Sequence, residues 1–228
     1  MRLSSLSLIL ALGWFASCEA QESPNKKDEA ATEEAKPKKE EGKSLFDGKT
    51  LKGWKKIPFG GSGDIEVEDG EIILYMGEVL TGIKLDGEPS LKTNYEISLE
   101  AKRIDGVDFF CALTFPIADA HSTFIVGGWG GSLVGISSID NMDASENSTG
   151  SVHKLDDKVW HKIRLRVTDT KLEAWIGDKQ VVQMMHTGHE MGMRSGEIEE
   201  CAPLGLATFQ TKAAYRNIRI KQVDPNEK

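Results

Sequence analysis

The chain has 228 residues and a formal net charge of -8. This length suits one large β-sandwich or at most two small domains. The acidic balance, without a block of basic residues, excludes a nucleic-acid partner, because nothing is present to neutralise the phosphates.

The first 20 residues have the layout of a secretory signal. Arg2 gives a short basic start, residues 6–15 form an apolar run too short to span a bilayer, and small residues follow. Two processing routes fit: cleavage after Ala20, or a lipobox ending at Cys18, which would then carry lipid. The lipobox is slightly favoured. We predict an exported protein, periplasmic or at the cell surface, whose membrane contact is an N-terminal lipid anchor.

Residues 21–43 predict a disordered, charged linker. They contain no aromatic or branched aliphatic residue, so they can bury almost nothing against the entropy lost on ordering. Mixed charge and two prolines favour an extended tether. The folded domain is expected at residues 44–228.

From residue 44 onward the apolar residues recur with the period of two that is typical of β-strands. Residues 65–67 and 72–75 predict a hairpin across Asp69–Gly70. Residues 108–116 are apolar on both faces, which predicts a central strand that is covered on each side. Further strands are expected at 79–85, 95–101, 124–129, 133–139, 160–168, 172–176, 180–184, 204–209 and 215–223. No amphipathic helix of ordinary length is present, so the fold class is all-β.

The two ends of this region carry recognisable motifs. Phe46–Trp54 reads Phe-Asp-Gly-Lys-Thr-Leu-Lys-Gly-Trp, and Arg216–Ile220 reads Arg-Asn-Ile-Arg-Ile. The pair resembles the opening and close of the 3-keto-disaccharide hydrolase domain family of exported bacterial proteins. The resemblance implies a concanavalin A-like jelly-roll sandwich of two antiparallel sheets. First and last strands lying side by side would close that sandwich and hide two sheet edges.

The same resemblance implies a carbohydrate partner and hydrolysis of 3-keto-disaccharide glycosidic bonds. Members of the family often carry Glu-x-Gln on a middle strand that faces the concave side. The corresponding region here is Ser122–Trp129, which has no carboxylate. This departure favours the alternative, a non-catalytic, lectin-like carbohydrate-binding module. A third hypothesis is a domain that binds another protein through a sheet face. No residue is assigned a catalytic role.

Trp129 and three loop residues are candidate sugar-binding groups. Glycine pairs on both sides of Trp129 would leave the indole face open to a sugar ring, unless the residue is part of the core. Asp140, Asn141 and Asp143 lie in a long polar loop and offer the acceptors and amides that hydroxyls need, although turn formation is the more common role of such residues.

Two further polar residues complete the predicted site. Glu100 lies on the polar face of an alternating strand, where it either lines a groove or forms an exposed cross-strand pair. His121 opens the next strand and is a candidate for the same groove, although a lone histidine near a loop is usually only a surface residue. We expect Glu100 and Trp129 to share one groove.

The two remaining cysteines and a stretch rich in methionine and histidine define no further site. Whether Cys111 and Cys201 pair stays open, because sequence does not fix their separation; Cys111 lies on an expected core face. Residues 184–193 concentrate methionine and histidine, but they lack the rigid spacing of a metal-binding helix. We predict neither a metal site nor a cofactor.

Overall fold

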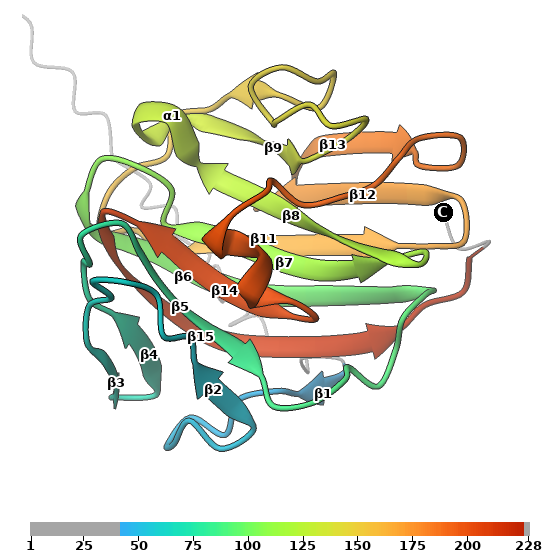
Figure 1. The fold of residues 1–228 in the computed structure, drawn as a ribbon. Coiled ribbons are helices and arrows are strands. Elements are labelled where there is room, and N and C mark those ends of the chain that lie inside the picture. Colours follow the sequence, from blue (N-terminus) through green and yellow to red (C-terminus); the bar gives the residue numbers. More distant parts are fainter. Residues whose placement is uncertain (1–41, 226–228) are drawn as a thin grey trace, which may run out of the picture. The chain divides into compact units, whose positions relative to one another are not determined.

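The computed structural model describes residues 42–225. Two antiparallel sheets form a sandwich (Figure 1). Sheet A has the order β13-β12-β11-β6-β15-β4-β3, with β1 paired to β15. Its strands are β1 (Lys43–Ser44), β3 (Ile65–Glu68), β4 (Glu71–Leu74), β6 (Tyr95–Gly106), β11 (His161–Val167), β12 (Lys171–Ile176), β13 (Lys179–Met185) and β15 (Thr211–Gln222). The expected all-β jelly roll is confirmed.

Sheet B has the order β10-β9-β8-β7-β14-β5-β2. Its strands are β2 (Trp54–Lys56), β5 (Leu80–Leu85), β7 (Cys111–Ile117), β8 (Ala120–Gly127), β9 (Leu133–Ser137), β10 (Ser151–Val152) and β14 (Gly205–Phe209). In the described part of the chain, helical structure is limited to one turn, α1 (Gly128–Gly131), and a 3-10 turn, η1 (Glu197–Cys201).

The main core lies between the two sheets, as the alternating pattern predicts. On β6, Ile97 and Leu99 point inward and are buried, while Ser98 and Glu100 point to the outer face of sheet A. Every residue of β7 is buried, which confirms a central strand covered on both sides. The expected hairpin is also present, with Ile65 opposite Leu74 across the Asp69–Gly70 turn.

The two ends of the domain lie side by side, as the terminal motifs predict. The Leu45 amide donates to the Ile218 carbonyl at 2.9 Å, and Phe46 and Ile218 are both buried in the core between the sheets. The expectation that this pairing closes the sandwich is wrong. β15 lies inside sheet A between β6 and β4. The two-residue β1 pairs with residues 219–220 of β15, on the same side as β4 but farther along the strand.

A segment between β13 and β14, residues 186–204, covers the outer face of sheet B; we call it the covering segment. In Figure 1 it is the orange-red stretch that crosses in front of β8 and β14. A second apolar cluster forms on this face, where Cys201 of the covering segment joins Ile57, Phe59, Leu80, Ala112, Ile125 and Ala207. The outer face of sheet B is therefore apolar and largely hidden, whereas that of sheet A is polar.

The signal, lipobox and linker predictions, with the lipidation of Cys18, lie outside the described residues. Cys111 belongs to the core between the sheets, and Cys201 belongs to the cluster on the opposite face of sheet B. Both cysteines are free and buried, so they do not pair with each other.

Candidate functional site

A pocket of about 320 Å³ opens on the outer face of sheet B, beside the covering segment. Strands β5, β8, β9 and β14 form its floor, and the covering segment and α1 form its walls. The lining residues are Val79, Leu80, Phe109, Thr123, Ile125, Trp129, Ser137, Arg194, Ser195, Glu197, Ile198 and Phe209. Its size is at the lower end of the range usual for small-molecule sites.

A shallower hollow of about 160 Å³ adjoins the pocket. It shares four residues with the pocket, namely Phe109, Trp129, Arg194 and Phe209, and adds Asp108. We call the pocket and the hollow together the cleft. The rings of Phe109 and Phe209 lie 5.7 Å apart, centroid to centroid, in the surface that the two parts share.

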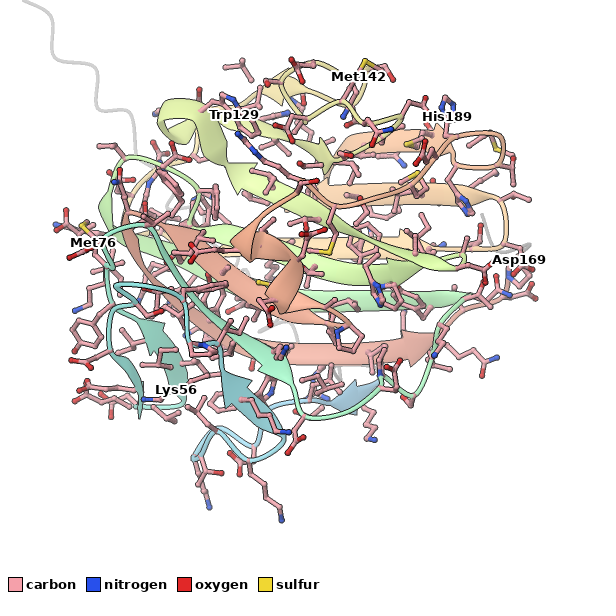
Figure 2. All side chains as sticks on the ribbon, in the orientation of Figure 1. Lys56, Met76, Trp129, Met142, Asp169 and His189 are labelled. Carbon is pink, nitrogen blue, oxygen red and sulfur yellow. The ribbon has the colours of Figure 1, made fainter. Side chains whose placement is uncertain are left out.

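Trp129 stands at the edge of the cleft on a tight left-handed turn. Its φ is 47°, a conformation that costs a residue with a side chain roughly 1–2 kcal/mol. Gly130 and Gly131 also have positive φ, at 86° and 97°, which glycine adopts without strain. The turn leaves the Trp129 side chain 43% exposed, and Figure 2 shows it at the outer edge of the domain. Strain of this kind in a non-glycine residue often marks a functional site.

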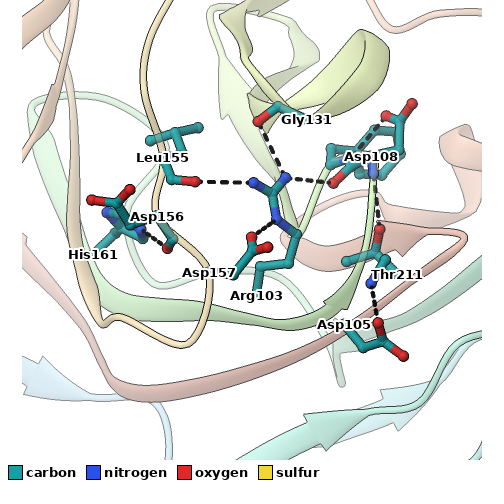
Figure 3. A network of polar contacts seen from close by, with 11 residues as sticks. Arg103, Asp105, Asp108, Gly131, Leu155, Asp156, Asp157, His161 and Thr211 are labelled. Atoms are coloured by element: carbon teal, nitrogen blue, oxygen red, sulfur yellow. Dashed lines mark hydrogen bonds and ion pairs between the residues drawn. The ribbon is translucent and has the colours of Figure 1, made fainter.

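A buried arginine holds this turn in place (Figure 3). The Arg103 guanidinium donates to the carbonyl oxygens of Gly131 at 3.1 Å, Leu155 at 3.0 Å and Asp108 at 3.3 Å. It also forms an ion pair with Asp157 at 2.6 Å. The Asp108 carboxylate also accepts the Gly130 amide at 3.3 Å, so the two residues that follow Trp129 are both held in place.

Asp143 holds the polar side of the pocket. One of its carboxylate oxygens accepts the Ser137 hydroxyl at 2.7 Å, and the other lies 3.1 Å from Nη1 of Arg194. Ser137 and Arg194 both line the pocket, while Asp143 lies behind them. Asp143 is therefore a positioning residue for the site rather than a lining one.

Strand β8 presents no carboxylate to the pocket. Its outward side chains there are Thr123 and Ile125, which the register places opposite Thr114 and Ala112 of β7. The region that corresponds to the Glu-x-Gln of the resembled family therefore supplies a hydroxyl and an alkyl group. The acidic groups of the cleft come instead from Glu197 on η1 and from Asp108.

Glu197 has the more open of these two carboxylates. It is exposed, and the structure gives it no hydrogen-bond or ion-pair partner among residues 42–225. The acidic run at residues 197–200 forms η1, because Ile198 and Cys201 pack against the outer face of sheet B and hold the run onto it.

The expected shared groove for Glu100 and Trp129 is wrong. Glu100 projects from β6 on the outer face of sheet A, where its carboxylate accepts Nε of Arg216 at 2.5 Å. Arg216 in turn lies over the Trp160 ring, with Cζ 4.1 Å from the centroid. Trp129 follows β8 and faces the cleft over sheet B, so the two residues lie on the outer surfaces of opposite sheets.

His121 lies on β8 in the outward row that continues to Thr123 and Ile125, but it does not line the pocket. Burial is the main cause that lowers the pKa of its imidazole, and the charge of Lys92 adds to the effect, while Glu88 opposes it. The histidine is therefore on the same face as the cleft but outside it.

Asp140 and Asn141 tie the long polar loop to the covering segment. Asp140 accepts Nδ1 of His189 at 2.7 Å and the amide of Glu190 at 2.8 Å, and these bonds lower the pKa of its carboxyl. Asn141 donates to Glu190 at 3.3 Å. Of the loop residues predicted from sequence, these two fix the loop without lining the cleft.

Sequence reasoning missed Arg194, Ser137, Phe109 and Phe209 as site residues. The signal for Phe209 was its outward position on a strand with apolar residues on both faces. Phe109 precedes β7 and has the inward parity of Cys111 and Leu113, so alternation does not mark it as a site residue. Arg194 lies in a glycine-rich stretch without periodicity, so nothing in the sequence marks its direction.

Two features are absent from residues 42–225. No group of three or more histidine, cysteine or acidic side chains there is placed to hold a metal ion. In the same residues, no helix is both long enough and apolar enough to cross a membrane.

Comparison with known proteins gives a family and a fold. Residues 41–221 match the 3-keto-alpha-glucoside-1,2-lyase-like domain. A comparison with curated proteins finds no match. Among solved structures, the chain is similar to a Parabacteroides distasonis ATCC 8503 protein provisionally named a glycosyl hydrolase, with 16% identity and a TM-score of 0.51. That alignment covers 79% of this chain and 93% of the other.

A second similar structure is a Bacillus subtilis protein of unknown function with a galectin-like fold. The identity is 10% and the TM-score 0.53, over 75% of this chain and 90% of the other. The apo Crh5 transglycosylase is similar at 13% identity and a TM-score of 0.51, over 77% and 81% of the two chains. At such identities these likenesses establish the jelly-roll fold alone.

Proposed function

The chain belongs to the 3-keto-alpha-glucoside-1,2-lyase-like domain family, and from that premise we propose that the cleft over sheet B binds a carbohydrate without cleaving it. The observation that carries this proposal is the exposed Trp129, held on a braced turn beside Asp108 and Arg194. An indole face stacks on the C–H face of a sugar, and a carboxylate and a guanidinium supply acceptors and donors for hydroxyl groups.

The side chains that strand β8 presents to the pocket argue against catalysis. Acid–base chemistry on a glycoside needs a carboxylate held within hydrogen-bond reach of the proton it moves. β8 offers Thr123 and Ile125 at the floor of the pocket, and the Thr123 hydroxyl is already engaged with that of Thr114 at 3.1 Å. Binding a carbohydrate without cleaving it does not require a carboxylate on β8.

One observation favours a second candidate, hydrolysis of a 3-keto-disaccharide. Glu197 lines the pocket with a carboxylate that is free to act as a base. In the reaction implied by the family, the 3-keto group acidifies the hydrogen on C2. A base removes that proton, a C1–C2 double bond forms as the glycosidic oxygen leaves with its electron pair, and water then adds to the product. Glu197 is the residue that would take the proton.

One experiment separates the two candidates. The purified protein is incubated with a 3-keto-α-glucoside and with its unoxidised parent, and release of the leaving group is followed by NMR while affinity is measured by calorimetry. Binding of either compound without turnover, and loss of that binding in Trp129→Gly, is the expected result. Turnover of the keto compound that disappears in Glu197→Gln would establish the enzyme instead.

Export remains a proposal that rests on residues 1–20. A labelled fatty acid should be incorporated into the full-length chain in bacteria and not into Cys18→Ser. Secretion of an unlabelled mature chain that begins at residue 21 would favour cleavage after Ala20.

A further inference from the structure

The two parts of the cleft differ in chemistry. Most of the pocket lining is apolar, with contributions from Val79, Leu80, Phe109, Ile125, Trp129, Ile198 and Phe209. Its volume of about 320 Å³ is roughly twice that of an apolar cavity of ~150 Å³ that admits one benzene molecule. The pocket is therefore large enough for a flat group of about two fused rings.

The two hydroxyls at the pocket floor and the guanidinium in its wall are already in use, which leaves Ser195 and Glu197 of the covering segment as the lining polar groups without a partner among residues 42–225. The Thr123 hydroxyl pairs with Thr114, and the Ser137 hydroxyl donates to Asp143. Arg194 is held by the same aspartate. A sugar ring in the pocket would leave several of its hydroxyls without partners, and each buried unsatisfied hydroxyl opposes binding. The pocket is suited to a group without hydroxyls.

The adjoining hollow has the opposite character. It is shallow, and Asp108 and Arg194 stand on its border beside the exposed ring of Trp129. A sugar placed there stacks on the indole and keeps its hydroxyls within reach of charged groups and of water. Phe109 and Phe209 border both parts, so one ligand can lie across them.

We infer that the ligand is a glycoside with an apolar, ring-containing aglycone: the aglycone enters the pocket and the sugar lies in the hollow against Trp129. This inference rests on the proposed carbohydrate-binding function and extends it by naming the group on the far side of the glycosidic bond. Residues 21–43 cannot supply the apolar group from within the chain, because they contain no aromatic or branched aliphatic side chain.

Three probes test the inference on the purified protein by calorimetry: 4-methylumbelliferyl α-D-glucoside, methyl α-D-glucoside and free 4-methylumbelliferone. Burial of a bicyclic ring is expected to make the first bind at least tenfold more tightly than the second. It is also expected to bind more tightly than the free aglycone, because the sugar adds its own contacts with Trp129.

Variants locate the aglycone. Val79→Ala and Ile198→Ala, which change residues that line the pocket but not the hollow, should each weaken the aryl glucoside at least threefold and leave methyl glucoside unchanged. Trp129→Gly should weaken both glucosides. Val152→Ala removes a 75% exposed apolar side chain that is not part of the cleft, and it should change neither affinity. Circular dichroism and thermal unfolding before titration show that each variant is folded.

Four outcomes would overturn the inference, and they bear differently on the proposed function. In two outcomes the aglycone is not in the pocket: methyl glucoside binds as tightly as the aryl glucoside, or neither pocket variant reduces the difference in affinity between the two glucosides. Carbohydrate binding stands in both cases. If only the free aglycone binds, or if none of the three probes binds, both the inference and the proposed function for glucosides are rejected.

Discussion

The carboxylate of Asp143 lies 3.1 Å from Nη1 of Arg194 and joins two loops that are far apart in the sequence. It connects the polar loop after β9 to the covering segment. Main-chain bonds between Ser138 and Gly192, at 2.8 and 3.1 Å, run beside it. The Arg194 side of the cleft is therefore positioned by this aspartate, although Asp143 does not line the cleft.

We predict that Asp143→Ala lowers glycan affinity severalfold, because Arg194 and Ser137 lose the group that orients them. The Arg194 side chain is 64% exposed, so the pair itself should stabilise the fold by only about 0.5 kcal/mol. A double-mutant cycle with Arg194→Ala tests both effects: urea unfolding measures the change in stability, and calorimetry measures the change in glycan affinity. Lys154→Ala, which breaks an exposed pair with Asp156, is the control and should leave affinity unchanged.

The pair between Asp140 and His189 should make stability depend on pH at the acid end. Bonds from His189 and from the Glu190 amide lower the pKa of Asp140 below its ordinary value of 3.8. A carboxyl with a lowered pKa in the folded state stabilises the protein above its unfolded pKa, and this contribution is lost as pH falls through the folded value. Asp140→Asn should therefore be less stable than wild type at pH 5, with the difference shrinking toward pH 3.

Chemical denaturation at the two pH values measures this difference. Asp178→Asn, in the turn between β12 and β13, is the control and should show no such convergence. A difference between Asp140→Asn and wild type that stays constant from pH 5 to pH 3 would show that the carboxylate charge is not what matters.

The two buried thiols should be inert in the folded protein. Burial raises the pKa of Cys201 to about 12 and raises that of Cys111 further, so almost no thiolate is present at pH 8. In the Cys18→Ser chain we expect no reaction with a maleimide until denaturant is added, and then two thiols per chain. Ser90→Cys places a thiol at an exposed position as a positive control. A single labelled thiol after unfolding would mean that one cysteine has been oxidised, and no labelled thiol would mean that both have.

The strands were predictable because burial in a sandwich leaves a period of two in the sequence. That period places Ile97 inward and Glu100 outward on β6 and identifies β7 as doubly covered. It says which face a residue takes within its strand, but not which sheet the strand joins. β6 belongs to sheet A and β8 to sheet B, so Glu100 and Trp129 were assigned to one groove that does not exist.

The cleft itself depends on the covering segment, and that segment has no periodic signal. Residues 186–196 are rich in glycine and polar residues, and they are held by loop-to-loop bonds of a kind that sequence patterns do not record. Ile125 and Ala112, which point outward yet are apolar, indicated that something covers sheet B. Which residues cover it, and that Arg194 faces the cleft, required the three-dimensional structure.

Arg103 should be far more important for stability than its exposed partner. Arg103→Met leaves the carbonyls of Gly131, Leu155 and Asp108 without their shared donor, and each buried acceptor left without a partner typically costs about 1–3 kcal/mol. Asp157→Asn keeps an acceptor for Nε of Arg103 at a position that is 57% exposed, so it should lower the unfolding free energy by less than Arg103→Met does. Urea unfolding compares the two.

The left-handed backbone of Trp129 makes a prediction with an unusual sign. At most positions glycine is less stable than alanine by about 0.5–1 kcal/mol, because it has more freedom to lose on folding. At a φ of 47° the side chain of alanine is strained, so Trp129→Gly should be more stable than Trp129→Ala by about 1 kcal/mol. Both variants should lose glycan binding alike, because both lack the indole.

Val159 provides the matched comparison, since its side chain is 48% exposed and its φ is not positive. There, the alanine variant should be the more stable of the two, and glycan affinity should not change in either. Thermal and urea unfolding of the four variants measures the two differences. If alanine is also preferred at position 129, the turn relaxes in solution. Trp129 would then not be held in place by the contacts of Arg103 and Asp108, and a fixed indole platform for a sugar could not be maintained.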